Sequence, residues 1–286
     1  MDKIVGLLRL LRPVNCSMMG LAVLIGELIT YGTLSPLAPS ILGFVTAFTL
    51  TGASMVANDY WDRYVDAVNA PKRPISSGLV SVKEALSYAT LLVAIGLSTA
   101  LMTNLTCFMI AIASLAISLF YNTKGKKMGL IGNFMVSACV AVPLLYGGFT
   151  HKGLNVNQEK LSLLLLFDLM VFLSNTGREI NKGMADVEGD AIRGVKTIAL
   201  SSGLKTAAKA AAVFYIIPVG LSVFPWLFNL SSEMYLPIVA VADVGFVSSS
   251  FILLHDYTKE NARRVKNMVL LWMVIGLFAF IVGGKG

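Results

Sequence analysis

Nine long apolar runs constrain the fold of this chain more than any other feature. Each run is close to the roughly 20 residues that an α-helix needs to cross a bilayer. In hydrocarbon the backbone must form its hydrogen bonds within each segment, so the runs predict helices rather than strands. We therefore expect an all-α, polytopic membrane protein, with a helix bundle around a central cavity that opens to the cytoplasmic side. The runs cover residues 14–32, 38–57, 84–102, 105–121, 130–150, 162–178, 204–226, 235–254 and 267–283.

The composition supports this interpretation. Charged residues make up 14% of the 286 residues and hydrophobic residues 56%, whereas a soluble domain carries roughly 25% charged residues. The net charge of +7 comes from lysines and arginines in the loops between apolar runs. This distribution indicates membrane topology and excludes a nucleic-acid groove.

The basic residues also predict the orientation. Of 23 lysines and arginines, only Lys152, Lys160 and Lys285 fall on one side of a nine-span topology, and the rest fall on the other. Because cytoplasmic loops carry the excess of positive charge, we expect a cytoplasmic N-terminus and an external C-terminus in the cell membrane. Residues 1–13 mix basic and apolar side chains, a pattern typical of a short helix on the membrane surface.

The first acidic cluster follows the second apolar run. If that helix continues past the bilayer edge, Asn58, Asp62 and Asp66 recur every four residues and share one face, with Asp59 close by. Stacked carboxylates repel one another, and a divalent cation relieves the repulsion. Mg²⁺ favours a few carboxylates together with substrate phosphate oxygens, so we predict that these four residues bind Mg²⁺. The alternative is a solvated acidic helix end.

The second cluster follows the sixth run and holds Asp186 and Asp190, again four residues apart. Four spans separate the clusters, so both are expected on the cytoplasmic face. Together they predict a site that holds Mg²⁺ on both sides of a diphosphate, with Asp62, Asp66, Asp186 and Asp190 as the catalytic acids. The layout also suggests one domain over residues 1–286, with four-helix halves at 14–121 and 130–254 and a final helix at 267–283.

A diphosphate needs cations from the protein as well. The same loops supply candidates, and two prolines stiffen the loop that holds the first pair. The interpretation that they only enforce topology remains open. The candidates for diphosphate binding are Lys72, Arg73, Lys124, Arg178 and Lys182.

Two long motifs resemble the UbiA-type membrane prenyltransferases. NDYWDRYVDAVNAPKRPISSG at 58–78 is similar to the first signature of that family, and ADVEGDAIRGVKTIAL at 185–200 is similar to the second. The resemblance spans essentially the whole chain. It implies Mg²⁺ as cofactor, and ionisation of a prenyl diphosphate followed by capture of the allylic carbocation by an acceptor. It also implies weaker substrate-binding candidates: Arg12, Asn15, Tyr121 and Glu179.

Within the family, REINKGMADVEGD at 178–190 and PKRPISSGLVS at 71–81 most resemble archaeal digeranylgeranylglyceryl phosphate synthases. The resemblance implies geranylgeranyl diphosphate as donor and the lipid-like geranylgeranylglyceryl phosphate as acceptor, which form the second ether bond of archaeal membrane lipids. One departure is Gly183, where such sequences often carry an acid, and Glu179 is a candidate substitute.

Three alternatives stay open from the sequence. An aromatic acceptor such as a quinone precursor would suit the same donor site. A CDP-alcohol phosphotransferase also uses intramembrane aspartates, but its DGxxAR motif does not occur in this sequence. A divalent-cation carrier would usually place acids near the bilayer midplane, whereas these acids lie at the ends of spans beside basic residues.

Overall fold

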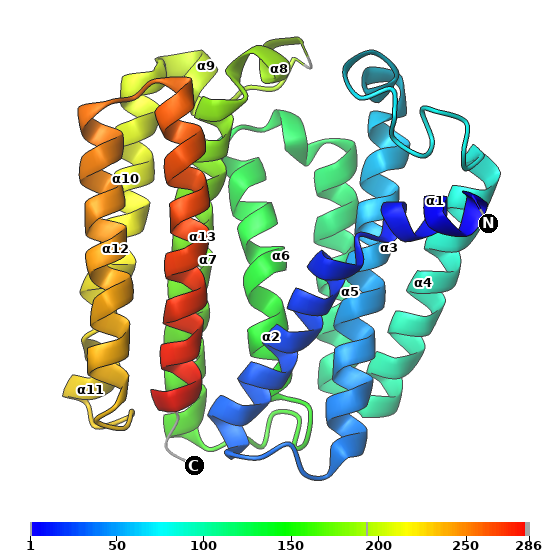
Figure 1. Ribbon diagram of the computed structural model, residues 1–286. Helices are drawn as coiled ribbons and strands as arrows, with labels where there is room; N and C mark the ends of the chain where they lie inside the picture. Colours follow the sequence, from blue (N-terminus) through cyan, green and yellow to red (C-terminus); the bar gives the residue numbers. More distant parts are fainter. Residues whose placement is uncertain (1, 193, 284–286) are drawn as a thin grey trace. The chain divides into compact units, whose positions relative to one another are not determined.

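The computed structural model describes residues 2–192 and 194–283, and these residues form helices and no β-strand (Figure 1). Among them, nine helices are long and apolar enough to cross a membrane, which confirms the predicted all-α class and number of spans. The helices are α1 (Asp2–Leu11), α2 (Pro13–Tyr31), α3 (Leu37–Asn69), α4 (Val82–Thr103), α5 (Leu105–Thr123), the 3₁₀ turn η1 (Gly125–Lys127), α6 (Leu130–Gly148), α7 (Gln158–Ala185), α8 (Val187–Ile192), α9 (Ile198–Ser202), α10 (Leu204–Leu221), α11 (Phe224–Leu227), α12 (Tyr235–His255) and α13 (Lys259–Gly283).

Several helices are longer than the apolar runs that predict them. α3 has 33 residues, so at 1.5 Å per residue it is about 50 Å long, against a hydrocarbon core of about 30 Å. Charged residues end an apolar run, but they do not interrupt backbone hydrogen bonding along a helix. The polar ends of α3 and α7 are therefore helical extensions. The extension of α3 carries the first acidic motif, and the second acidic cluster begins at Asp186, where α7 ends.

The chain divides into two compact units. Unit 1 comprises residues 1–27, 34–123 and 142–156, and unit 2 comprises residues 28–33, 124–141 and 157–286. Both α2 and α6 therefore contribute to each unit. The single domain with two four-helix halves stays a prediction.

In unit 1, α3 packs along α4 and α5, and α1 lies against α3 (Figure 1). Leu10 and Leu11 at the end of α1 are buried with Val56 of α3 and with Val80 in the loop before α4. Gly6 of α1 lies against the same loop, since a Cβ there would come within 2.7 Å of the Val80 side chain. The first helix is thus fastened to the segment that follows the acidic end of α3.

Close backbone contact joins α2 to the second half of α6, also within unit 1. A Cβ on Gly26 would lie 1.9 Å from the carbonyl oxygen of Leu144, and one on Gly147 would lie 2.0 Å from that of Val23. Only glycine fits at either position. Small residues of this kind let membrane helices approach closely, where dispersion contacts and not the hydrophobic effect hold them together.

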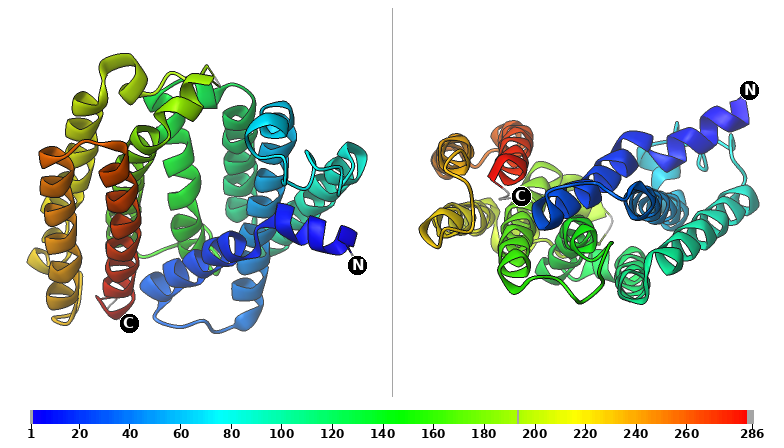
Figure 2. Two further views of the ribbon diagram at one scale, coloured as in Figure 1. Left: turned by 45° about the horizontal axis from the view of Figure 1, so that its top comes forward. Right: turned by 90° about the horizontal axis from the view of Figure 1, so that it is seen from below.

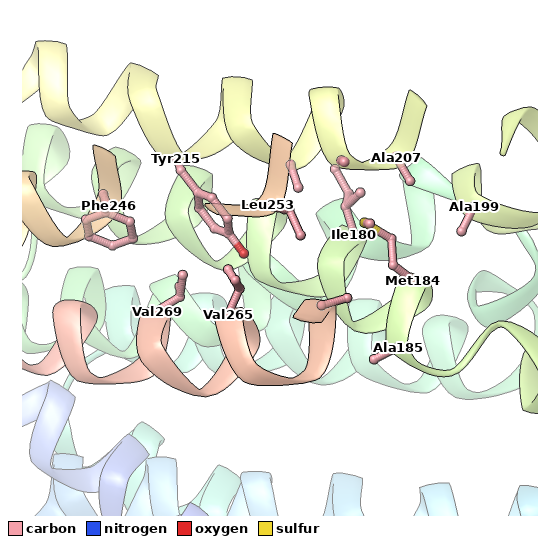
Figure 3. Packing of buried hydrophobic residues seen from close by; sticks show 13 residues of the cluster. Ile180, Met184, Ala185, Ala199, Ala207, Tyr215, Phe246, Leu253, Val265 and Val269 are labelled. Carbon is pink, nitrogen blue, oxygen red and sulfur yellow. The ribbon is translucent and has the colours of Figure 1, made fainter. Parts of the chain in front are cut away.

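In unit 2, four long helices form a ring of contacts in which α7 meets α10, α10 meets α12, α12 meets α13 and α13 meets α7 (Figure 2). Tyr215 and Phe246 pack together at the centre of the ring, and Phe167 stacks on Phe280 with ring centroids 3.9 Å apart. The cluster continues to the end of α7 that carries the second motif, where Met184 is fully buried (Figure 3). This packing fixes the backbone from which the second acidic cluster extends.

Candidate active site

The first acidic cluster lies on the last turns of α3, in unit 1. Asn58 donates a hydrogen bond from Nδ2 to Oδ2 of Asp62 at 3.2 Å. The contact shows that side chains four residues apart do share a face here, as the helical spacing requires. Asp62 is partly buried, whereas Asp59 and Asp66 are buried.

Two arginines meet the buried acids of this cluster. Arg12 donates from Nη2 to Oδ1 of Asp59 at 2.7 Å, and Arg73 approaches the same oxygen at 3.4 Å. Arg73 also donates from Nη1 to Oδ2 of Asp66 at 2.5 Å. The other oxygen of Asp66 is buried and has no hydrogen-bond partner among the residues described. A buried carboxylate oxygen of this kind needs a partner, which an ordered water or a bound cation can supply.

Turns hold Arg73 in place. In the loop between α3 and α4, the Arg73 N–H donates to the carbonyl of Ala70, and the Ser77 N–H donates to the carbonyl of Arg73. The Ser76 hydroxyl donates to the carbonyl of Arg63 on α3 at 3.3 Å. These bonds tie the loop back to the helix that carries the acids. Arg73 and the exposed Lys72 line an open pocket together with Ala70, Pro71 and Pro74.

Arg12 occupies the junction between α1 and α2. Its backbone φ is 52°, in the left-handed region that residues other than glycine seldom adopt. Its N–H donates to Leu8 at the end of α1, and its carbonyl accepts from Asn15 and Cys16 at the start of α2. The single residue therefore ends one helix and begins the next, while its side chain reaches Asp59.

The second acidic cluster lies in unit 2, at the end of α7. Asp186 is the C-terminal cap of α7 and is exposed, and its carbonyl accepts from the N–H of Asp190 in α8. A Cβ on Gly183 would lie 3.9 Å from Oδ2 of Asp190 and 3.3 Å from Cγ2 of Thr197. Gly183 therefore faces the second motif, as the resemblance implies. At the surface of α8, Lys259 pairs with Glu188 and lowers the pKa of that carboxyl.

Glu179, one turn before Gly183, is buried between two cations. Arg178 donates to Oε1 at 3.2 Å and Lys182 to Oε2 at 3.1 Å. Asn181 donates to the hydroxyl of Tyr215 at 3.5 Å, a contact that the sequence did not suggest. The Arg178 Nε and the Asn181 Oδ1 are buried without a partner within the described chain. Arg178 and Lys182 thus gather around a carboxylate, as Arg12 and Arg73 do in unit 1.

The three remaining candidates lie at the ends of other helices. Asn15 is exposed in the first turn of α2, Tyr121 is partly buried near the end of α5, and Lys124 is exposed just before η1. Their substrate contacts stay predictions.

The donor atoms suit magnesium rather than a softer metal. Across residues 2–192 and 194–283, no three His, Cys, Asp or Glu side chains come together as a ready-made metal cage. Mg²⁺ does not need one, because it is usually held by one or two carboxylates plus substrate phosphates and waters. Asp62 and Asp66, one turn apart with a bare Asp66 oxygen, fit that mode of binding.

Known proteins similar to this chain identify its family. The UbiA prenyltransferase family matches residues 19–277. A digeranylgeranylglyceryl phosphate synthase from Methanopyrus kandleri is 36% identical over 275 residues, which cover 96% of this chain and 97% of that protein.

Solved structures give the same result for the fold. The structure of a digeranylgeranylglyceryl phosphate synthase is 30% identical, with a TM-score of 0.85 and 99% of each chain covered. A UbiA homologue from Archaeoglobus fulgidus, solved with GPP and Mg²⁺, has a TM-score of 0.67 over 96% of this chain and 99% of its own; at 21% identity the likeness is one of fold. The chain is therefore a multi-pass membrane protein that belongs to the UbiA prenyltransferase family.

Proposed function

We propose that this chain transfers a geranylgeranyl group from geranylgeranyl diphosphate to the hydroxyl of geranylgeranylglyceryl phosphate, with Mg²⁺ as cofactor. The product carries the second ether bond of an archaeal membrane lipid. The observation that carries the proposal is the end of α3, where the bare oxygen of Asp66 lies beside the Arg73 guanidinium. A carboxylate for a cation and a guanidinium for a phosphate, side by side, suit a metal-bound diphosphate.

The choice of donor and acceptor rests on the relatives. Those named digeranylgeranylglyceryl phosphate synthase cover nearly the whole chain at 30–36% identity, and the motif at 178–190 resembles the same enzymes. Mg²⁺ is supported by the A. fulgidus homologue solved with GPP and Mg²⁺.

In this proposal both acidic clusters are sites for Mg²⁺. Asn58, Asp62 and Asp66 bind it from α3, and Asp186 and Asp190 bind it from the second motif. When bound, Mg²⁺ supplies Lewis-acid stabilisation of charge on the leaving diphosphate. Asp62 and Asp66 also place their negative charge on the side of the site where the cation must bind.

The basic residues bind and orient the diphosphate. Arg73 comes from the stiff loop that follows α3, with Lys72 beside it, and Arg178 and Lys182 come from the end of α7. Lys124 is a further candidate. Cations fixed by the fold need no reorganisation as charge develops on the leaving group, and this is what makes them effective.

The bond between C1 of the prenyl chain and the diphosphate oxygen breaks, and the electron pair leaves with the diphosphate. The allylic carbocation then accepts an electron pair from the acceptor hydroxyl, and the hydroxyl proton is released to water. Since the leaving group is activated, the nucleophile needs little help, and the clusters accordingly consist of acids and cations.

The proposal places this chemistry at the cytoplasmic face of the cell membrane. The distribution of lysine and arginine supports a cytoplasmic N-terminus and an external C-terminus. A lipid-like acceptor would then enter from the membrane. Each acidic motif lies at the end of a spanning helix, so in this proposal its carboxylates bind Mg²⁺, and through it phosphate groups, at the interface between membrane and water.

The experiment offers purified protein Mg²⁺ and geranylgeranyl diphosphate, with geranylgeranylglyceryl phosphate or an aromatic quinone precursor as acceptor. We expect diphosphate release and a diether product, detected by mass spectrometry, with the first acceptor only. Glu84→Gln is the matched control, because Glu84 pairs with Lys3 at the surface and glutamine keeps the helix cap. Product with the aromatic acceptor alone would reassign the substrate, and no diphosphate release with either would overturn the proposal.

A further inference from the structure

We propose that Asp59 is a positioning residue and not a magnesium ligand: it holds Arg12 and Arg73 together as a fork that binds a phosphate group. The inference deepens the proposed function, on which it rests. It separates Asp59 from the other two acids of the first motif, Asp62 and Asp66, by what each side chain contacts.

The contacts of Asp59 set it apart. One oxygen, Oδ1, accepts from Arg12 at 2.7 Å and from Arg73 at 3.4 Å. An ionised carboxylate oxygen offers about two sites for hydrogen bonds, so the two guanidiniums use the capacity of this atom. The residue is only 4% exposed, and a charge this far from water needs its partners. Oδ1 of Asp59 is therefore shared by two arginines, whereas Asp66 contacts Arg73 through one oxygen and has a buried second oxygen without a partner among the described residues.

The two arginines keep further N–H donors beyond these contacts. Their side chains are 34% and 32% exposed, although Asp59 and Asp66 are buried. Each guanidinium has five N–H donors in a planar fork that matches a phosphate, and one nitrogen of each meets the acids. The partly exposed guanidiniums therefore keep positive charge and N–H donors that a phosphate group can reach.

The arginines come from separate segments, and Asp59 is what joins them. Arg12 lies between α1 and α2, and Arg73 lies in the loop after α3. Like charges in this proximity repel unless a carboxylate lies between them. The left-handed backbone of Arg12 (φ 52°) is a second, independent sign. Strained backbone of this kind persists where the surrounding structure requires it, and it is concentrated at binding sites.

A phosphate at this fork has two sources, the diphosphate of the donor or the single phosphate of the acceptor. Binding probes separate them without turnover, so the test does not depend on prenyl transfer. Inorganic pyrophosphate with Mg²⁺ represents the donor, and glycerol phosphate represents the acceptor. Isothermal titration of the full chain in detergent gives both dissociation constants, and electron paramagnetic resonance with Mn²⁺ alone reports the metal site.

For Asp59→Asn we expect the dissociation constant of one phosphate probe to rise by about tenfold or more, because the fork loses its anchor. The Mn²⁺ dissociation constant should change by less than about twofold, whereas Asp62→Asn should raise it clearly. The probe that loses affinity identifies the source. Glu84→Gln should alter neither value.

Two outcomes would overturn the inference: loss of Mn²⁺ affinity in Asp59→Asn like that in Asp62→Asn, or unchanged affinity for both phosphate probes. If Asp59→Asn does not fold, Arg12→Gln and Arg73→Gln must each weaken the same probe and leave Mn²⁺ binding intact. Where Asp59→Asn does fold, it should be combined with Arg12→Gln and Arg73→Gln. The triple variant should have the same dissociation constant for the phosphate probe as the variant that carries the two arginine substitutions alone. Absence of prenyl transfer in the parent chain would count against the proposed function alone.

Discussion

Arg73 donates a hydrogen bond of 2.5 Å to one oxygen of Asp66, and the second oxygen of that carboxylate is buried without a partner in the described chain. The arginine neutralises the carboxylate while leaving it half-satisfied. A fully satisfied acid would be a poor metal ligand, and an unpaired one would be costly to bury. The pair is thus stable alone and still able to take a cation.

Asp66→Asn should lower kcat/KM by about 100-fold or more, equivalent to about 2.7 kcal/mol of transition-state stabilisation. The amide removes the negative charge from the proposed metal-binding face and gives Arg73 a weaker partner. Diphosphate release measured over a range of Mg²⁺ concentrations checks this. Excess Mg²⁺ should restore part of the activity, and Glu84→Gln, at the surface beside Lys3, serves as the control. Near-normal activity at low Mg²⁺ would contradict the role of Asp66.

Gly183→Asp should lower the Mg²⁺ concentration needed for half-maximal activity. The new carboxylate would extend from a Cβ 3.9 Å from the Asp190 oxygen, so it would strengthen the second cluster as a cation site and repel Asp190 when no cation is present. Thermal unfolding should therefore show a lower Tm than Gly183→Ala without Mg²⁺, with the difference shrinking as Mg²⁺ is added. Gly183→Ala isolates the effect of the Cβ against Thr197. A Tm difference that Mg²⁺ leaves unchanged would speak against a metal at this cluster.

His151→Ala should destabilise the protein by about 3–5 kcal/mol, because it removes the histidine partner of the buried Glu27 side chain. Glu27 of α2 is fully buried, and it contacts His151 and also accepts from the Ser40 hydroxyl at 2.6 Å. Thermal unfolding in detergent measures the loss. The double variant Glu27→Gln, His151→Ala should recover most of it, since the amide carries no charge to bury. Equal Tm values for His151→Ala and the parent would show that the contact contributes nothing.

Much of the fold follows from the sequence because the bilayer permits few alternatives. A run such as 84–102 must be a helix if it spans hydrocarbon, and α4 covers it. The shared face of Asn58 and Asp62 follows from helical spacing in the same way, and their hydrogen bond shows it. These are properties of one segment at a time.

Contacts between distant segments could not be predicted in this way. Arg12 and Asp59 are 47 residues apart, and Glu27 and His151 are 124 apart. No periodicity within a segment encodes which of several arginines reaches which acid, since that depends on how α1, α3 and the intervening loops pack. The two arginine contacts of Asp59 Oδ1, which distinguish Asp59 from its neighbours in the motif, appear only in three dimensions.

Gly147→Val should prevent close packing of α2 against α6 and reduce the yield of folded protein. The Cβ alone would lie 2.0 Å from the Val23 carbonyl oxygen and 2.9 Å from the Glu27 nitrogen. Backbone atoms cannot move aside as a flexible side chain does, so the helices must separate and lose their dispersion contacts. Gly220→Ala is the matched control, because a Cβ there meets nothing within 4 Å, and alanine favours the helix by about 0.5–1 kcal/mol. Size-exclusion profiles and Tm values in detergent compare the two, and a Gly147→Val protein as stable as Gly220→Ala would refute the close contact.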